Sequence, residues 1–339
     1  MNKLLQKIRP ERLRELILLL LISVVLIFFA SVIERYLNAR LFNRVSASVA
    51  IMALLAIAQT LVILTRNIDL SVGAVVGFTA YFVGYQLSQN QEITPLVAIL
   101  MAIGVGALMG GFNGFLVAFC GIPSIIVTLG TMALYRTLLV EYSDAQTVLT
   151  VNLPQWLLDI PRVNILSFDG LNLRLMVGVM IAIVILFQLF LRYTSFGRKI
   201  YAVGSNPEAA SNSGFPNRKI IFITFILCGA LAGLSGFMYL ARFGNITVVA
   251  GLGLELKSVA AAVVGGVNIF GGSGSIFGSV LGAILIDLLE NSLIRWLQIS
   301  EFWRDAMLGI LILASVAADS VIMKRFRRYR LKKQTETKS

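Results

Sequence analysis

The sequence contains no histidine, only two cysteines and few charged residues. Cys120 and Cys228 each lie in or beside an apolar block, so neither a disulfide framework nor a Cys/His metal site is available. Without histidine, the Ser–His and Cys–His pairs of nucleophilic catalysis are also missing, which argues against a membrane enzyme. We therefore expect a non-catalytic protein that binds no cofactor.

Charged residues make up only 14% of the chain, whereas hydrophobic residues make up 58%. A soluble domain needs about a quarter of its residues charged to cover its surface. The apolar residues fall in long blocks, such as 16–33 and 47–64, and blocks of roughly 20 residues match the hydrocarbon thickness of a bilayer. Because backbone polar groups in lipid must be satisfied within their own segment, these blocks predict membrane-spanning helices.

The predicted fold is an all-α integral membrane bundle of about ten transmembrane helices. We expect one transmembrane domain over residues 1–323 and a basic cytoplasmic tail over 324–339. The first block follows five basic residues, but it is too long for a signal peptide, so we expect it to be retained. The expected helices are 16–34, 46–64, 70–88, 94–118, 123–140, 173–191, 220–240, 257–269, 276–294 and 305–323.

The net charge of +12 is concentrated in a few places, since 18 of the 29 lysines and arginines lie in segments 1–15, 192–219 and 324–339. The positive-inside rule places all three segments in the cytoplasm, which an even number of spans allows. Segment 141–172 carries four acidic residues against one arginine and is expected outside. The basic tail is explained as a topology and lipid-headgroup signal, so nucleic acid is not an expected partner.

A short helix is predicted inside the basic 192–219 segment. Its residues suit their positions: a polar N-cap, a proline at the first helical position and an acidic residue near the positive helix end. Two alanines propagate the helix, and a glycine ends it in a left-handed conformation. A helix this short is marginal alone, so it is either a docking element held by a partner or an ordinary connection. In order, the residues are Asn206, Pro207, Glu208, Ala209, Ala210 and Gly214.

Segment 64–77 places Arg66, Asn67 and Asp69 between two apolar blocks. Asp69 or Ser71 is suited to cap the following helix, and Asp69 is near enough in sequence to pair with Arg66. One interpretation is a capped turn at the membrane surface, and the other is a turn that lines the inner gate of a transport path. Further candidates for this gate or path are Asn113 and Asn268.

Three features of the sequence bear on mechanism. Ionisable residues inside such blocks mark function unless they lie near helix ends, where we expect Arg136, Asp287 and Glu290. Glycines recur every fourth residue in 106–114 and 229–233, which predicts closely packed helices. The glycine-rich segment 253–283 lacks the Gly-Lys-Ser/Thr ending of a P-loop, so nucleotide binding of that kind is excluded and the energy for any active process must come from elsewhere.

Four segments together resemble the permeases of bacterial monosaccharide-type ABC importers, in the ribose and branched-chain amino acid permease superfamily. Within that family, residues 64–73 (LTRNIDLSVG), 128–136 (TLGTMALYR) and 301–314 are most similar to autoinducer-2 import permeases, with rhamnose permeases next. The four segments are 67–77 (NIDLSVGAVVG), 113–136 (NGFLVAFCGIPSIIVTLGTMALYR), 204–215 (GSNPEAASNSGF) and 254–283 (LELKSVAAAVVGGVNIFGGSGSIFGSVLGA).

The resemblance implies a set of partners and a location. The partners are ABC ATPase subunits, an extracytoplasmic substrate-binding protein, and a second copy of this permease or a paralogous one. Residues 204–215 would contact the ATPase, and segments 141–172 and 241–256 would face the binding protein. The chain would be a multi-pass protein of the bacterial inner membrane with both termini in the cytoplasm.

The favoured substrate from the resemblance is autoinducer-2, with rhamnose or another monosaccharide as the alternative. Two rivals remain. An ion-coupled secondary transporter would depend on a proton or sodium gradient rather than on ATP. A scaffold component of the same importer would contain no transport path, and importer activity would survive its deletion.

Overall fold

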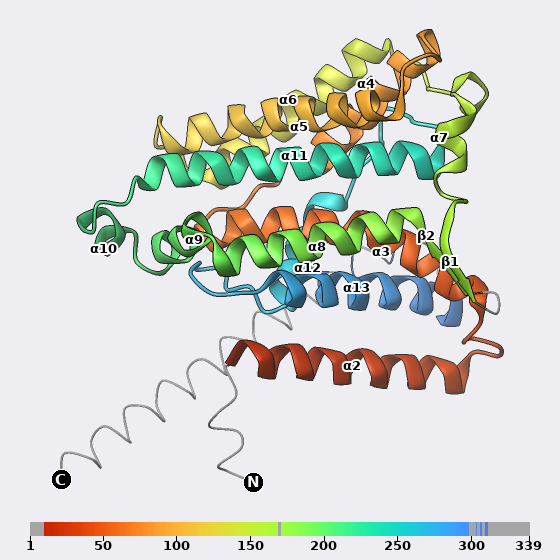
Figure 1. The fold of residues 1–339 in the computed structure, drawn as a ribbon, viewed down its shortest axis with the longest axis horizontal. Helices are drawn as coiled ribbons and strands as arrows, with labels where there is room; N and C mark the ends of the chain where they lie inside the picture. The colour runs from red at the N-terminus through yellow and green to blue at the C-terminus, as the bar shows by residue number, and fades with distance from the viewer. Residues whose placement is uncertain (1–9, 169–170, 298–302, 304–305, 307–308, 311–339) are drawn as a thin grey trace.

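The computed structural model describes residues 10–168, 171–297, 303, 306, 309 and 310. Long helices run side by side along one direction (Figure 1). They are α2 (Pro10–Val32), α3 (Ala39–Leu64), α4 (Val72–Gln89), α5 (Pro95–Ala118), α6 (Ser124–Ser143), α8 (Leu175–Tyr193), α11 (Asn217–Phe243) and α13 (Ile276–Leu297). Shorter elements are the 3-10 helix η1 (Thr150–Asn152), α7 (Gln155–Asp159), α9 (Ser195–Ser205), α10 (Pro207–Asn212) and α12 (Leu254–Val264).

The predicted all-α membrane fold is confirmed. Among the described residues, seven helices are long and apolar enough to cross a membrane, and α4 is the long helix outside that set. The predicted range 257–269 is wrong as a full span, because α12 has only 11 residues and measures about 16 Å. It stops where the following segment turns at glycines with positive φ, such as Gly266. The tail 324–339, and the predicted helix 305–323 apart from residues 306, 309 and 310, lie outside the described residues.

Segment 141–172, which the charge pattern predicts to lie outside, also contains structure that the all-α prediction missed. Strands β1 (Asn164–Phe168) and β2 (Leu171–Arg174) form an antiparallel hairpin in which Ser167 pairs with Asn172. The Asn172 amide donates to Asn43 Oδ1 at 3.2 Å, which fixes the hairpin to the start of α3. The hairpin and α7 lie at the end of the bundle opposite α9 and α10 (Figure 1).

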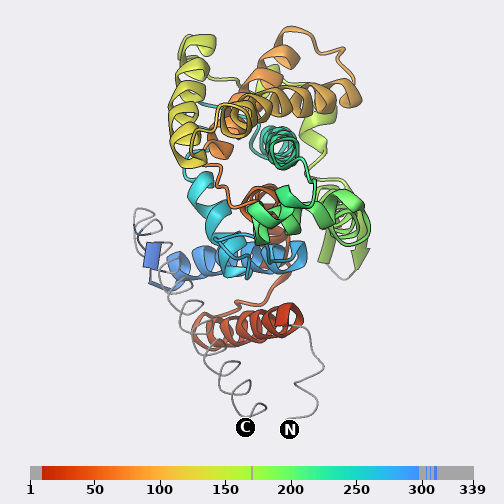
Figure 2. The ribbon, with the colours of Figure 1, turned by 90° about the vertical axis from the view of Figure 1, so that its left-hand side faces the viewer.

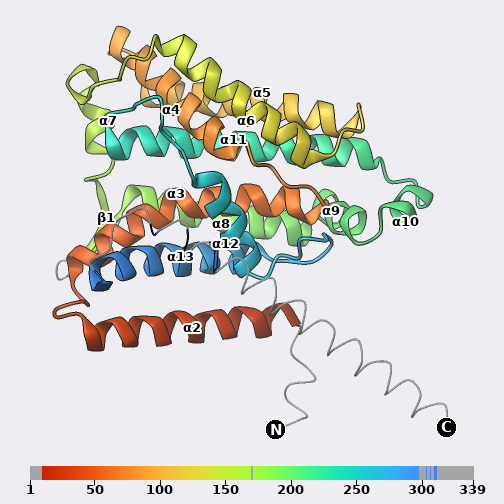
Figure 3. The same cartoon turned by 180° about the vertical axis from the view of Figure 1, so that it is seen from behind.

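Helix α3 forms the centre of the bundle, and the outer helices are far more exposed. In its most apolar stretch, 94% of the α3 residues are buried, against 17% in α2. A helix that is apolar all round belongs in a core, whereas an exposed apolar face suits lipid. In the end-on view α2 lies at the edge of the molecule (Figure 2). The short helix α12 runs obliquely between α3 and α13 (Figure 3).

Helices α5 and α11 pack with their backbones in contact. A Cβ atom at Gly106 would overlap the carbonyl oxygen of Gly229 and lie 2.8 Å from the Gly233 nitrogen. A Cβ at Gly110 would lie 2.9 Å from the Gly229 Cα. The glycine spacing therefore places small residues on both facing surfaces, as the sequence predicted.

Candidate functional site

The short helix predicted within 192–219 is present as α10. The Asn206 side chain caps it by accepting a hydrogen bond from the Ala209 amide at 3.0 Å. Pro207 is its first residue, and Gly214 beyond its end has φ +80°. Each of these features follows from local backbone chemistry. The prediction of the local structure is confirmed.

Helix α10 has one buried and one exposed side. Ala210 is buried, whereas Glu208 and Ala209 are exposed. Asn217 Nδ2 donates to the Pro207 carbonyl oxygen at 2.7 Å, which fastens α10 to the first residue of α11. The helix therefore presents a small surface at one end of the bundle while it is fixed to a core helix (Figure 1).

Helix α9, which leads directly into α10, was missed by the sequence reasoning. Thr194 caps it, because its hydroxyl oxygen accepts from the Gly197 amide at 2.9 Å. Its apolar face buries Ile200 and Val203 completely or nearly so. A threonine followed by apolar residues at a spacing of three to four is the signal that predicts such a helix.

Arg66 ties the end of α9 to the turn between α3 and α4. Its Nε donates to the Gly204 carbonyl oxygen and its Nη2 to the Ser205 carbonyl oxygen, both at 2.6 Å. The Gly272 amide donates to the Leu64 carbonyl oxygen at 3.0 Å at the same point. We call these five residues the Arg66 junction. Because it joins three segments far apart in sequence, a displacement of α9 must act on all of them.

The Arg66 junction leaves no room for a side chain at Gly204. A Cβ atom there would overlap the Leu64 carbonyl oxygen and lie 2.6 Å from the Gly272 nitrogen. Glycine is thus required by close backbone approach, which gives the residue a role that its position in a helix alone does not explain.

The loop over residues 265–275, which contains Gly272, is also held by α2. Arg14 Nη1 donates to the Gly266 carbonyl oxygen at 3.0 Å. The Ser275 hydroxyl donates to Glu15 Oε1 at 2.6 Å. The loop is therefore a meeting point of α2, α3, α9, α12 and α13.

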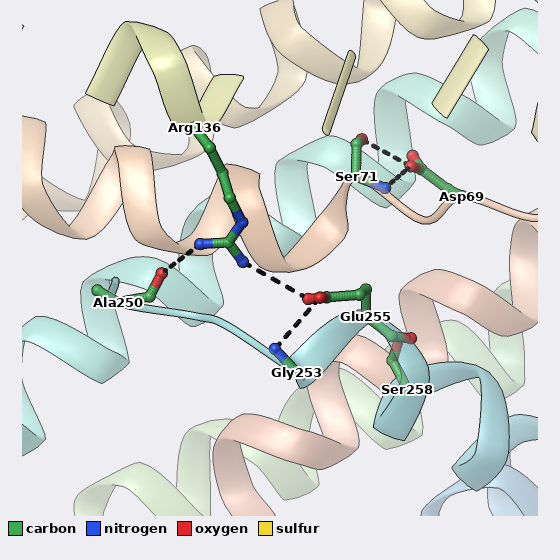
Figure 4. A network of polar contacts seen from close by, with 7 residues as sticks. All are labelled: Asp69, Ser71, Arg136, Ala250, Gly253, Glu255 and Ser258. Carbon is green, nitrogen blue, oxygen red and sulfur yellow. Dashed lines mark hydrogen bonds and ion pairs between the residues drawn. The ribbon is translucent and has the colours of Figure 1, made fainter. Parts of the chain in front are cut away.

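Asp69 lies in a buried polar cluster and does not pair with Arg66. Its Oδ1 accepts from the Ser71 amide at 2.8 Å and from the Ser71 hydroxyl at 2.7 Å (Figure 4). Asn113 Nδ2 donates to the Ser71 Oγ at 2.8 Å. The predicted Arg66–Asp69 pair is wrong because the guanidinium donates to the Gly204 carbonyl instead.

The cluster around Asp69 joins α3 and three further helices, α5, α6 and α11, to the α3–α4 turn. Gln59 Nε2 on α3 donates to the Asp69 carbonyl oxygen at 2.8 Å. The Tyr135 hydroxyl on α6 donates to Asn113 Oδ1 on α5 at 3.2 Å, and the Cys228 thiol on α11 lies 3.9 Å from Asp69 Oδ2. The structure thus brings Asp69 and Asn113 together, while Arg66 belongs to the junction.

The two other predicted path residues serve local turns. Asn67 Nδ2 donates to the Thr65 carbonyl oxygen at 2.9 Å. Asn268 Oδ1 accepts from the Phe270 amide at 3.0 Å. Such contacts are typical of asparagine in turns and explain both residues without a transport role.

Arg136 on α6 pairs with Glu255 at the start of α12 (Figure 4). Arg136 Nη2 lies 3.7 Å from Glu255 Oε2, and the two side chains are 21% and 11% exposed. Arg136 Nη1 also donates to the Ala250 carbonyl oxygen at 3.4 Å, and the Gly253 amide donates to Glu255 Oε1 at 3.2 Å. The pair therefore fixes the loop that precedes α12 against helix α6.

The expectation that the ionisable residues of the spans lie near helix ends is wrong. Arg136 and Glu290 lie about two turns inside α6 and α13, and Asp287 lies near the middle of α13. For α6, the predicted helix end at residue 140 was too close to Arg136, because the helix extends to Ser143. Ionisable groups this far inside a span point to function.

Comparison with known proteins gives a consistent family. The sequence profile of the branched-chain amino acid transport system/permease component family matches residues 41–316. The autoinducer 2 import system permease protein LsrC of Salmonella typhi is 33% identical over 306 residues, covering 90% of this chain and 85% of the relative. Its counterparts in Escherichia coli (strain K12/DH10B) and Shigella flexneri are 34% identical, each with 90% of this chain and 86% of the relative covered.

No solved structure matches this chain. The family match spans most of the chain, the helices suit a bilayer, and the relatives share nearly the whole length. The chain therefore belongs to the permease family of ABC importers, as a multi-pass protein of the inner membrane.

Proposed function

We propose that this chain is the membrane-spanning permease subunit of an ATP-driven importer for a sugar or sugar-like small molecule. ATP would be hydrolysed by separate ABC ATPase subunits. An extracytoplasmic binding protein would deliver the substrate, and a second permease, identical or paralogous, would complete the membrane assembly. The named relatives favour autoinducer-2 as the substrate, and rhamnose or another monosaccharide is the alternative.

The observation that carries this proposal is the mechanical connection of α10. The helix is exposed on Glu208 and Ala209 and fastened to α11 through Asn217. Immediately before α10, the carbonyl oxygens of Gly204 and Ser205 accept hydrogen bonds from Arg66. A force applied to α10 by an ATPase subunit therefore reaches α3, α11 and the loop before α13.

This arrangement suits alternating access, in which part of the bundle rocks against the rest. Closure of the two ATPase subunits would press on α10, and the Arg66 junction would pass the displacement to the loop at the end of α12. The Asp69 cluster and the Arg136–Glu255 pair hold the neighbouring turns in place on either side. In this scheme α10 and both termini face the cytoplasm, and the hairpin and α7 face the binding protein.

The proposal is tested by reconstituting the chain with its ATPase and binding protein in proteoliposomes. Labelled autoinducer-2 and labelled rhamnose would be offered in turn. We expect uptake that requires ATP and stops when the ATPase carries an inactivating substitution. Uptake that persists with an inactive ATPase and follows a proton or sodium gradient would contradict the proposal.

A further inference from the structure

A polar cavity of about 360 Å³ lies between α3, α11, α12 and α13, apart from the Arg66 junction and the Asp69 cluster. Arg242 in the last turn of α11 lines it, which places it toward the end of the bundle opposite α9 and α10 (Figure 1). The volume falls in the range of small-molecule sites, roughly 300–1,000 Å³. Besides Tyr239, its polar lining residues are Ser48, Arg242, Lys257, Asp287, Glu290 and Asn291.

The polar groups of the cavity are held in place by one another. Lys257 Nζ lies 2.7 Å from Glu290 Oε1, and both side chains are only 13% exposed. Asn291 Nδ2 donates to Asp287 Oδ2 at 3.1 Å, and Asp287 is 6% exposed. Charged groups inside a membrane bundle are costly to bury. Four of them around one cavity are therefore difficult to explain by packing alone.

The charges around the cavity balance. Arg242 and Lys257 carry positive charge, and Asp287 and Glu290 carry negative charge. A site with no formal net charge favours neither a cation nor an anion. It does present strong donors beside strong acceptors, and each hydroxyl group of a ligand both donates and accepts hydrogen bonds. This pattern suits a neutral compound with several hydroxyl groups.

The rest of the lining suits the carbon skeleton of such a compound. Tyr239 and Phe243 line the cavity, and their ring centroids lie 4.4 Å apart. Ile51, Met52 and Ile286 add apolar surface. Pockets for small molecules combine apolar walls with a few placed polar groups, and a sugar ring has apolar C–H faces as well as hydroxyls.

We propose that this cavity is a binding site for a neutral polyhydroxylated molecule of monosaccharide size. The proposal deepens the importer function and rests on it. The permease itself then contacts the transported molecule and does not leave recognition entirely to a binding protein. Its place away from the Arg66 junction separates the ligand site from the point where force would enter.

The test uses the full permease in lipid nanodiscs, without binding protein, and saturation-transfer NMR, which detects weak ligands. The probes are D-ribose and L-rhamnose as neutral polyols, with L-lysine and L-glutamate as charged molecules. Ser48→Phe fills the cavity without removing a charge. Ser46→Phe is the matched control, because Ser46 lies on the same helix but lines a separate apolar hollow.

A second variant keeps the proposal testable if Ser48→Phe does not fold. The double substitution Lys257→Met/Glu290→Met removes both members of the ion pair together, so that neither is left as an unpaired buried charge. We expect at least one neutral polyol to bind the unmodified permease and the Ser46→Phe control. Binding should weaken about tenfold or more in Ser48→Phe, because the new ring occupies the cavity, and in the double variant, because charge-assisted hydrogen bonds are lost.

Three results would overturn the cavity proposal: no neutral polyol binds, a charged probe binds better, or both variants bind as well as the control. The ATP dependence of uptake is measured on the same proteins. If Ser48→Phe permits normal ATP-driven uptake, the cavity proposal fails while the importer function holds. If uptake ignores ATP, the importer function itself fails.

Discussion

Gly204 offers the most direct way to disturb the connection between α10 and the bundle. In Gly204→Ala, the new Cβ would overlap the Leu64 carbonyl oxygen and lie 2.6 Å from the Gly272 nitrogen. Ordinary contacts are about 3.5–4.0 Å, so the end of α9 must move away from Gly272 by about 1 Å. Both obstructing atoms belong to the backbone, which has no rotamer to change.

The magnitude follows from two opposing effects. Alanine in a helix is favoured over glycine by about 1 kcal/mol, whereas overpacking a tight contact costs typically 1–3 kcal/mol and occasionally more. The substitution should therefore leave the permease close to its normal stability. If the same 1–3 kcal/mol is lost from the coupling between the ATPase contact at α10 and the transport path, the coupling weakens by roughly 5- to 150-fold.

The assay measures ATP-driven uptake and ATP hydrolysis in proteoliposomes, together with the melting temperature of the permease. Gly104→Ala is the matched control, because Gly104 also lies in a helix and a Cβ there meets nothing within 4 Å. We expect Gly104→Ala to transport normally. Gly204→Ala should hydrolyse ATP but transport far less.

Normal transport by Gly204→Ala, at a normal ratio of transport to ATP hydrolysis, would show that the contact of Gly204 with Leu64 and Gly272 does not couple α10 to the bundle. So would equal losses of transport in Gly204→Ala and Gly104→Ala, because the effect would then not depend on the contact with Leu64 and Gly272.

Three further predictions concern single contacts. Arg66→Lys keeps the charge but not the paired hydrogen bonds to α9, so uptake per ATP should fall while a melting curve changes little. Gly106→Leu should prevent close packing of α5 on α11 and lower the yield of folded permease, whereas Gly104→Leu should not. Arg136→Met alone should lower the melting temperature more than Arg136→Met/Glu255→Met, because the single change leaves a buried carboxylate unpaired at a cost of about 3–5 kcal/mol.

Helix α10 was predictable because its signals are local. A capping asparagine, a proline at the first position and a left-handed glycine act over a few residues, and the structure contains all three. The membrane helices were predictable for a related reason, since apolar length alone selects them.

The contacts that connect α10 to the bundle were not predictable from one sequence. Arg66 reaches Gly204 across 138 residues of sequence, and no local pattern favours that partner over Asp69, three residues away. Lys257 and Glu290 likewise meet through the approach of α12 to α13. The full-span prediction for 257–269 failed because hydropathy does not register the glycine turns that shorten α12.

In the proposed importer, α10 is the point at which an ATPase subunit acts on this chain. This role is tested by cross-linking Glu208→Cys to the ATPase in the assembled importer, with the exposed Cys120 replaced by serine and the buried Cys228 retained. Val163→Cys, exposed beside the hairpin at the opposite end, is the control. We expect Glu208→Cys, and not Val163→Cys, to form an adduct with the ATPase that stops ATP-driven uptake. The absence of that adduct, or labelling of Glu208→Cys only from outside the cell, would contradict this role of α10.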